Sequence, residues 1–268
     1  MKKFNKVMAI ALVGLMTIAS AGCSSKSNSS DASSSSSSSS SAEGNTEESG
    51  KLIMATNAEF PPYEYYDGDS IVGIDVEIAQ AIAETMGKEL VIDDIAFDSI
   101  IPAVTSGKAD IGLAGMTVTE DRLVNVDFSD TYCQASQVII VKKDNTEITT
   151  PDDLVGKKIG VQLGTTGDIY SGDIEGAQVE RFSKGFEAVL SLQQGKLDAV
   201  VIDDQVAKAF ADANSDVVVI EEPFTQEEYA IAVNKGNEEL LTQLNDAIKE
   251  LKESGKLDEI VAKYISAE

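Results

Sequence analysis

Short apolar runs alternate with longer amphipathic segments along residues 51–268 of this 268-residue chain. The runs are rich in Val and Ile and are bounded by Gly, Asp or Asn, which is typical of buried strands. Segments 75–86 and 237–254 place apolar side chains on one helical face, and each is followed by a glycine. Nine strands are predicted: Leu52–Ala55, Leu90–Ile92, Ile111–Ala114, Val138–Val141, Lys158–Val161, Val179–Phe182, Ala199–Ile202, Val217–Ile220 and Ala230–Val233. This alternation predicts an α/β fold with largely parallel sheets.

One short pattern occurs twice, as Gly-Lys-Ala-Asp-Ile at 107–111 and as Gly-Lys-Leu-Asp-Ala at 195–199. In each copy the glycine ends a predicted helix and the aspartate leads into a buried strand. Two interpretations remain open: a common helix-to-strand turn used twice, or two similar α/β lobes. In open α/β sheets, ligands bind beyond the carboxyl ends of strands. The loops after these two strands are therefore the first candidates for a site.

The first of these loops carries Gly115, which lets another group approach the backbone closely, and an arginine in a short helix that Thr119 is predicted to cap. Positive charge at the start of a helix is unfavourable against its dipole. A guanidinium aimed at a bound carboxylate would explain Arg122, because its fork matches two oxygens. The alternative is a surface arginine paired with Asp121 or Asp127.

Two further loops open predicted helices. Asp203 and Asp204 follow a buried strand, so that each is either an N-cap or a partner for a ligand cation. The Gly-Thr-Thr-Gly run at 164–167 offers free N–H groups to an anion or serves as a neutral cap. Segment 57–66 has four aromatic residues and two prolines, which predicts a stiff apolar wall or a rigid loop packed on the core. Phe97 is interpreted as a core residue.

Composition excludes several functions. The net charge of −25 repels nucleic-acid phosphates, and the absence of histidine excludes a His-based triad and an imidazole metal site. Two cysteines are too few for a Cys-rich zinc module, so neither a metal nor a cofactor is predicted. Cys133 is predicted to be a buried, unreactive thiol without a disulfide. An enzyme would have to rely on Asp, Glu, Lys, Tyr, Ser or Cys.

Residues 1–22 have the pattern of a signal peptide, with a basic start and an apolar run, Val7–Ala19, that is too short to span a bilayer. Residues 20–23 read Ser-Ala-Gly-Cys, which resembles the lipobox of bacterial lipoproteins, so Cys23 is predicted to be lipidated. Residues 24–50 contain 15 serines, which predicts a disordered linker over 23–50. A lipid-anchored protein on the outer face of the bacterial cell membrane is expected.

Several motifs resemble a known family. They are Ala-Thr-Asn at 55–57 with Phe-Pro-Pro-Tyr-Glu at 60–64, Val-Gly-Ile-Asp-Val at 72–76, Phe-Asp-Ser-Ile-Ile-Pro at 97–102, Leu-Ala-Gly-Met-Thr-Val-Thr at 113–119 with Arg122, Val-Asp-Phe-Ser at 126–129, Gly-Thr-Thr-Gly at 164–167 and Asp-Ala-Val at 198–200. The chain resembles the polar amino-acid-binding proteins of bacterial ABC importers, solute-binding protein family 3. In this family, Gly73 and Asp75 would form a strand-to-helix turn.

The resemblance implies a type II periplasmic-binding-protein fold with two lobes, two hinge strands and an interlobe ligand cleft. Lobe 1 would comprise 51–132 plus 229–268, and lobe 2 would comprise 136–226, with hinges near 133–135 and 227–228. The implied partners are an amino acid and a membrane permease of an ABC importer, and the chain is expected to be a monomer. Alternatives are a cyclohexadienyl-dehydratase-like enzyme, for which no residue but Glu59 is a candidate proton-transfer group, or a non-transport sensor.

The resemblance also implies roles for individual residues. Arg122 and the Thr117 and Thr165 positions would hold the ligand's α-carboxylate, while the Gly115 carbonyl and Asp203 would hold its α-ammonium. The other implied ligand-binding residues are Phe60 and Phe97 as apolar cover, Asn57, Glu59, Gln162 and Thr166 for side-chain selectivity, and Met116. A polar or cationic amino acid is expected, although some relatives that take cations carry Asp at the Asn57 position.

Overall fold

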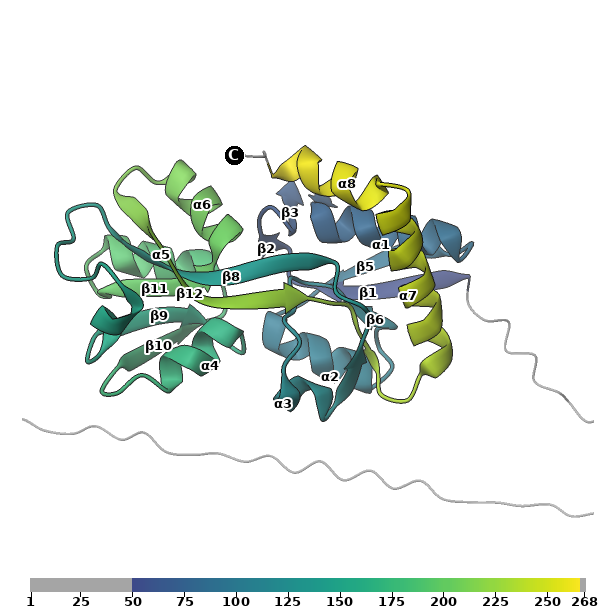
Figure 1. Ribbon diagram of the computed structural model, residues 1–268, viewed down its shortest axis with the longest axis horizontal. Helices are drawn as coiled ribbons and strands as arrows, with labels where there is room; N and C mark the ends of the chain where they lie inside the picture. Colours follow the sequence, from purple (N-terminus) through teal and green to yellow (C-terminus); the bar gives the residue numbers. More distant parts are fainter. Residues whose placement is uncertain (1–49, 266–268) are drawn as a thin grey trace, which may run out of the picture. The chain divides into compact units, whose positions relative to one another are not determined.

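The computed structural model describes residues 50–265 (Figure 1). The described residues belong to one compact unit. The predicted signal peptide, the lipidation of Cys23 and the Ser-rich linker lie outside the described residues. Within 50–265, none of the helices is long and apolar enough to cross a membrane.

The first sheet has five strands in the order β5-β1-β6-β13-β7. Strand β1 pairs in parallel with β5 on one side and β6 on the other, whereas β13 runs antiparallel to β6 and β7. The bounds are β1 Lys51–Thr56, β5 Glu89–Asp94, β6 Ile111–Gly112, β7 Val126–Phe128 and β13 Ala232–Asn234. Its helices are α1 Ile74–Thr85, α2 Ile100–Thr105 after the 3-10 turn Phe97–Ser99, α3 Glu120–Leu123, α7 Glu238–Glu253 and α8 Lys256–Tyr264.

A small antiparallel sheet, in the order β2-β3-β4, follows β1. Its strands are β2 Glu59–Phe60, β3 Glu64–Asp67 and β4 Ser70–Val72. The sequence predicts only a stiff segment here, because strands of two to four residues are too short to show an alternating pattern.

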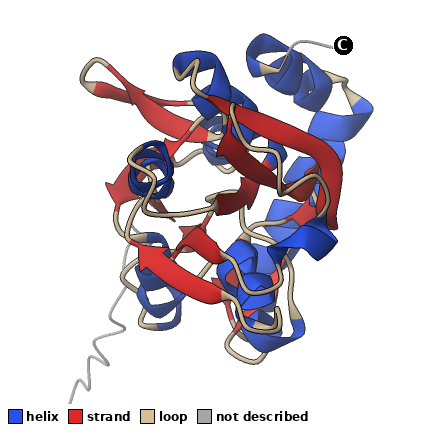
Figure 2. Cartoon of the chain, turned by 90° about the vertical axis from the view of Figure 1, so that its left-hand side faces the viewer, coloured by secondary structure: helices blue, strands red, loops and turns tan. Residues whose placement is uncertain are grey.

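The second sheet also has five strands, in the order β10-β9-β11-β8-β12. Strands β10, β9 and β11 run parallel, while β8 is antiparallel to β11 and β12. The bounds are β8 Cys133–Lys142, β9 Lys158–Gln162, β10 Gln178–Phe182, β11 Ala199–Asp203 and β12 Val217–Tyr229. The connecting elements are the 3-10 turn Pro151–Leu154 and the helices α4 Thr166–Gly172, α5 Gly185–Gln193 and α6 Asp204–Ala213, drawn in blue beside the red strands in Figure 2.

The two sheets confirm the α/β class and show how far the prediction of largely parallel strands holds. In each sheet three neighbouring strands are parallel, and antiparallel strands complete it. All nine predicted strands coincide with observed ones, although β6 is shorter than predicted and β13 begins later. β7 and α8 were not predicted.

Strands β8 and β12 are the long pair of the second sheet and lie side by side in Figure 1. Their register runs from Val217 opposite Lys142 to Tyr229 opposite Cys133, with an irregularity between Ile220 and Thr225. Beyond Tyr229 the chain enters β13 of the first sheet, and before Cys133 it leaves β7 of that sheet. These two strands are therefore the connections between the two sheets.

Gly73 fixes the turn between the small sheet and α1. Its φ is +132°, and a Cβ there would lie 2.1 Å from the carbonyl oxygen of Tyr63. We expect Gly73→Ala to lower the free energy of unfolding by about 3 kcal/mol, because backbone strain and an unrelievable clash add. Gly87→Ala is the control, since its φ of +65° is strained but its Cβ would meet nothing within 4 Å. Urea unfolding checks both, and equal losses would contradict the argument.

Candidate functional site

Ten of the twelve predicted ligand-binding residues line one pocket. They are Asn57, Phe60, Phe97, Gly115, Thr117, Arg122, Gln162, Thr165, Thr166 and Asp203. Five further residues complete the lining: Glu64, Ala114, Gln137, Ile202 and Tyr229. They come from loops and strand ends of both sheets, which is the place where ligands bind in open α/β folds.

Arg122 is buried at the edge of this pocket, with only 7% of its surface exposed. Its Nη1 donates to the carbonyl oxygen of Thr117 at 2.6 Å. Its Nη2 donates at 3.1 Å to the carbonyl oxygen of Gly164, in the loop that follows β9 of the second sheet. Thr119 Oγ1 accepts from the Arg122 amide, as predicted for an N-cap. The alternative of a surface arginine paired with Asp121 or Asp127 is therefore wrong, because the carbonyls on both sides draw the guanidinium inward.

Asp203 is fully buried on the opposite side of the lining. Its Oδ1 accepts from the amides of Gln205 and Val206, which confirms the N-cap of α6, and its Oδ2 accepts from the Tyr229 hydroxyl at 2.7 Å. Burial, and then the nearby charge of Asp204, raises the pKa of Asp203 to about 7. One oxygen of the Asp203 carboxyl thus caps α6, and the other contacts Tyr229 in the pocket lining.

A second carboxylate lies beside Thr117. Buried Glu227, on β12, accepts from Thr117 Oγ1 at 2.7 Å and from Gln137 Nε2 at 3.1 Å through its Oε2. Burial lowers the pKa of Arg122, and the charge of Glu227 acts in the opposite direction. Glu227 was not predicted, since the acidic segment 227–228 offers no signal that one of its two carboxylates faces inward.

The amides of Asn57 and Gln162 join the two sides of the pocket. Gln162 Nε2 donates to Asn57 Oδ1 at 2.9 Å, and Asn57 Nδ2 donates to the carbonyl oxygen of Ile95 at 2.9 Å. Because that carbonyl can only accept, the orientation of both amides follows. Gln162 Nε2 also donates to the carbonyl oxygen of Ser183 at 3.5 Å, whereas the Gln162 side-chain oxygen is left as an acceptor and Asn57 Nδ2 keeps a second N–H.

Thr165 caps α4 as predicted, accepting from the amide of Asp168 at 3.2 Å and donating to the carbonyl of Gln162 at 2.8 Å. The neutral-cap interpretation of the Gly-Thr-Thr-Gly run is thus confirmed. Thr165 and the buried Thr166 nonetheless line the pocket.

Aromatic rings form the apolar wall. Phe97 stacks against the Arg122 guanidinium, 5.4 Å from the ring centroid. Phe60 lies against Gly115, whose φ is +52° and whose added Cβ would meet the Phe60 ring at 2.9 Å. The predicted close approach at Gly115 is therefore observed. Phe97 is both part of the core, as predicted, and part of the lining.

Two buried carboxyls lie beneath this wall. Asp75 Oδ2 accepts from the Gly115 amide at 2.8 Å and from the Tyr132 hydroxyl at 2.9 Å, so that it anchors the loop as its place in the helix turn suggests. Burial raises the pKa of Asp75 to about 6 and that of Glu64 well above its usual range, the latter with a contribution from the charge of Asp75. Glu64 belongs to the lining, which the sequence did not predict.

The other two predicted site residues lie outside the lining. Met116 is buried in the core cluster that contains Phe97. Glu59 forms an ion pair with Lys184, the residue that precedes α5, and so engages a cation of this chain. Cys133 is a free, half-buried thiol, more accessible than predicted, and burial raises its pKa to about 12.

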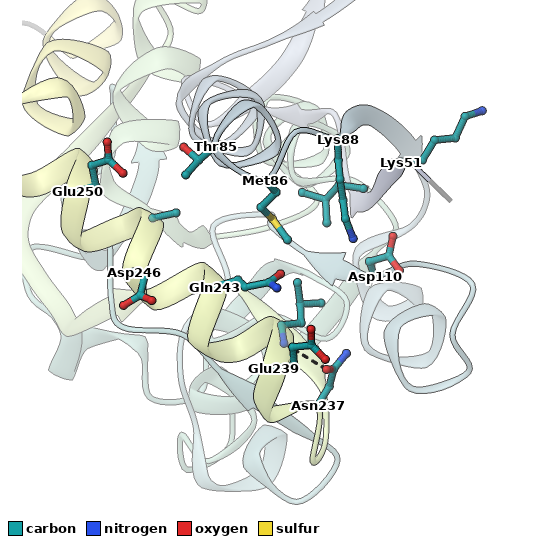
Figure 3. Close-up of a pocket in the computed structure, with 13 residues that line it drawn as sticks. Lys51, Thr85, Met86, Lys88, Asp110, Asn237, Glu239, Gln243, Asp246 and Glu250 are labelled. Atoms are coloured by element: carbon teal, nitrogen blue, oxygen red, sulfur yellow. Dashed lines mark hydrogen bonds between the residues drawn. The ribbon is translucent and has the colours of Figure 1, made fainter. Parts of the chain in front are cut away.

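The pocket is narrow, with a volume of about 20 Å³, enough for about one water molecule. A roomier surface pocket of about 570 Å³ lies between α7 and the end of α1 (Figure 3). Figure 3 shows Glu239, Gln243, Asp246 and Glu250 along α7, with Lys88 across from them. That pocket is open and lined by solvated charges of both signs, whereas the narrow one gathers buried charges and aromatic rings. We therefore assign the functional site to the narrow pocket.

Comparison with known proteins identifies the family. Residues 52–267 match the bacterial extracellular solute-binding proteins, family 3, and the chain belongs to this family. The arginine-binding extracellular protein ArtP of Bacillus subtilis is 34% identical over 269 residues, which cover 98% of this chain and 99% of ArtP. A probable histidine-binding protein of Neisseria gonorrhoeae is 37% identical over 229 residues, or 82% of this chain and 85% of that protein.

Solved structures of related binding proteins resemble this fold. An ancestral arginine-binding protein bound to arginine is 43% identical, with a TM-score of 0.78, covering 81% of this chain and 99% of that one. The ancestral amino acid-binding protein AncCDT-1, a precursor of cyclohexadienyl dehydratase, is 37% identical with a TM-score of 0.75, covering 80% and 95%. The fold is that of a two-lobed type II periplasmic binding protein, and the chain is a bacterial extracellular solute-binding protein.

Proposed function

We propose that this chain is the receptor of an ABC importer and that it captures an amino acid, with arginine the first candidate, between its two lobes. The observation that carries the proposal is the pairing of a buried guanidinium and a buried carboxyl in one pocket lining, Arg122 and Asp203. A zwitterion needs opposed partners for its carboxylate and its ammonium, both shielded from water. Arg122 would hold the first and Asp203 the second.

The side-chain oxygen of Asn57 favours a ligand side chain that donates hydrogen bonds. With Asn57 Nδ2 bonded to Ile95, an incoming group that displaced Gln162 would meet the Asn57 Oδ1 acceptor. A guanidinium has five N–H donors and no acceptor, and the amide of glutamine also has N–H donors, whereas a carboxylate has none. Arginine, then glutamine, therefore fits better than glutamate. ArtP, a relative named for arginine, supports this order.

Ligand entry would require the two sides of the pocket to separate. Contacts that join them include those of Arg122 with Gly164, Gln162 with Asn57 and Tyr229 with Asp203, and the Lys184–Glu59 ion pair. Ligand pockets usually measure roughly 300–1,000 Å³, far more than this one. We place the hinges near 133–135 and 227–228 of β8 and β12, with the lobes divided as the sequence predicts. Ligand binding would then be linked to hinge motion.

Delivery to a membrane permease and anchoring through a lipidated Cys23 complete the proposal, with the protein acting as a monomer. Names of relatives such as the ABC transporter glutamine-binding protein GlnH of Bacillus subtilis support delivery to a transporter. The lipobox supports the anchor. The dehydratase alternative is less well supported, because its proposed proton-transfer group, Glu59, is paired with Lys184.

A thermal-shift screen of residues 46–268 against the twenty amino acids tests the binding function. A ligand at a hundred times its Kd adds about 2.7 kcal/mol to the free energy of unfolding, because it binds only the folded state. We expect arginine to raise Tm by several degrees, glutamine by less, and glutamate not at all. If no amino acid raised Tm, the proposed function would be refuted.

A further inference from the structure

Glu227 is an inward-facing carboxylate in a strand whose neighbouring residues face out. Gln226 and Glu228 are exposed, whereas Glu227 is 6% exposed. A backbone bridge between Thr117 and Tyr229, with the Val118 amide donating to the carbonyl of Glu228, holds the pocket loop against β12. This pairing brings the Glu227 carboxylate to the Thr117 side chain.

Every polar partner of Glu227 is a hydrogen-bond donor. Thr117 Oγ1 and Gln137 Nε2 donate to Oε2 at 2.7 and 3.1 Å, and Thr225 Oγ1 donates to Oε1 at 3.3 Å. Such a set stabilises an ionised carboxylate. The charge of Glu227 also acts favourably on Arg122, which is buried and otherwise bonded to neutral carbonyls.

A ligand carboxylate would need the Thr117 hydroxyl and the Arg122 guanidinium, the two groups on which Glu227 already acts. A threonine hydroxyl has one proton, so Thr117 can donate to Glu227 or to a ligand, but not to both. A second anion beside Arg122 would also be repelled by Glu227. We propose that Glu227 is an internal competitor of the ligand's α-carboxylate: it retains the Thr117 hydroxyl and opposes added negative charge beside Arg122, and thereby limits the affinity of the site. This inference rests on the proposed function.

The neutral variant Glu227→Gln tests the inference on residues 46–268. A neutral hydrogen bond is about half as strong as a charge-assisted one, so Thr117 is released more easily and the repulsion disappears. By calorimetry we expect L-arginine to bind roughly five- to tenfold more tightly to E227Q than to the wild type. The affinity for L-argininamide, which lacks the α-carboxylate charge, should differ less than twofold between E227Q and the wild type. Glu228→Gln, at the exposed neighbour, should change the affinity for neither L-arginine nor L-argininamide.

Comparing L-arginine with L-argininamide shows whether Glu227 competes with the ligand's α-carboxylate or merely supports the structure of the site. If E227Q weakened both probes equally, or left both unchanged, the inference would be overturned. If E227Q did not fold, Glu227→Asp would serve instead, because its shorter side chain withdraws from Thr117 while the charge stays. We expect E227D to gain affinity for L-arginine, but less than E227Q. No gain in affinity would overturn the inference.

The outcome for the wild type keeps the two proposals distinct. Binding of another amino acid in place of arginine would leave the capture function intact, and that amino acid and its α-carboxamide would become the probe pair. If the wild type bound no amino acid, the proposed function would fail and the inference with it. If the wild type bound arginine but E227Q showed no selective gain, the inference alone would fail.

Discussion

Replacing Arg122 with alanine is expected to weaken the binding of any α-amino acid about a thousandfold, to the point where calorimetry detects none. The guanidinium is buried and spans carbonyls from both sides of the pocket, so it is the group in the lining suited to meet a carboxylate with two hydrogen bonds. Removing one partner of a buried charge pair costs roughly 3–5 kcal/mol, most of it from the charge left unpaired.

Two variants make this result specific. Arg181→Ala removes an arginine that forms an ion pair with Asp168 but is half-exposed and lies outside the pocket lining. We expect the R181A variant to bind amino acids with an affinity within twofold of the wild type. Arg122→Lys keeps the charge and loses the fork, so its loss should be intermediate. If R122A bound amino acids as tightly as the wild type, the assignment of the carboxylate site would be wrong.

Amino-acid binding is expected to weaken as the pH falls from 7 to 5, by up to tenfold per pH unit. Burial raises the pKa of Asp203 to about 7, so that below this pH a proton must leave the carboxyl before an ammonium can pair with it. For stability the sign is opposite. Between about pH 4 and pH 7 the folded protein retains a proton that the unfolded chain has lost, so the contribution of Asp203 to folding stability falls as the pH rises.

Asp203→Asn separates this effect from other titrations. Asparagine can still cap α6, so the fold should persist, while affinity at pH 8 drops about a hundredfold and the slope below pH 7 disappears. Asp75, whose pKa is about 6, is present in both proteins, so the difference between them reports Asp203. Asp204→Asn removes the neighbouring charge that helps to raise the pKa of Asp203, so it should keep the slope but move it to lower pH. An unchanged slope in D203N would assign the titration to another group.

Local signals account for what the sequence predicted well. The cap at Thr119 was predicted from residue type and position, and the caps at Thr165 and Asp203 were each one of the alternatives left open; all three have the expected hydrogen bond. Buried strands such as β9 and β11 were found because their pattern depends on neighbours in the chain. The strands that were missed, β2, β3, β4 and β7, have two to four residues, too few for a period to be detected.

The site itself shows the limit of local signals. The family resemblance indicated twelve site residues, of which ten line the pocket, whereas spacing alone left open which alternative Arg122 would follow. Glu227 was missed because its neighbours Gln226 and Glu228 are also polar, so the sequence does not reveal which face of the strand is buried. Gln137 was missed because it is a polar residue at the edge of the apolar run 138–141. Glu59 was expected near the ligand, and its ion pair with Lys184, 125 residues away, could not be predicted from either segment alone.

The sequence by itself determined the alternation of strands and helices, the helix starts and the residue types available for a zwitterion, because these depend on neighbours within a few positions. Only the tertiary structure decided that Arg122 is buried, that Asn57 and Gln162 meet, and that Glu227 reaches Thr117, 110 residues away. These contacts depend on how two sheets joined by β8 and β12 are brought together. The burial of charge at the site is a property of that arrangement, because the contacts that produce it join segments far apart in the chain.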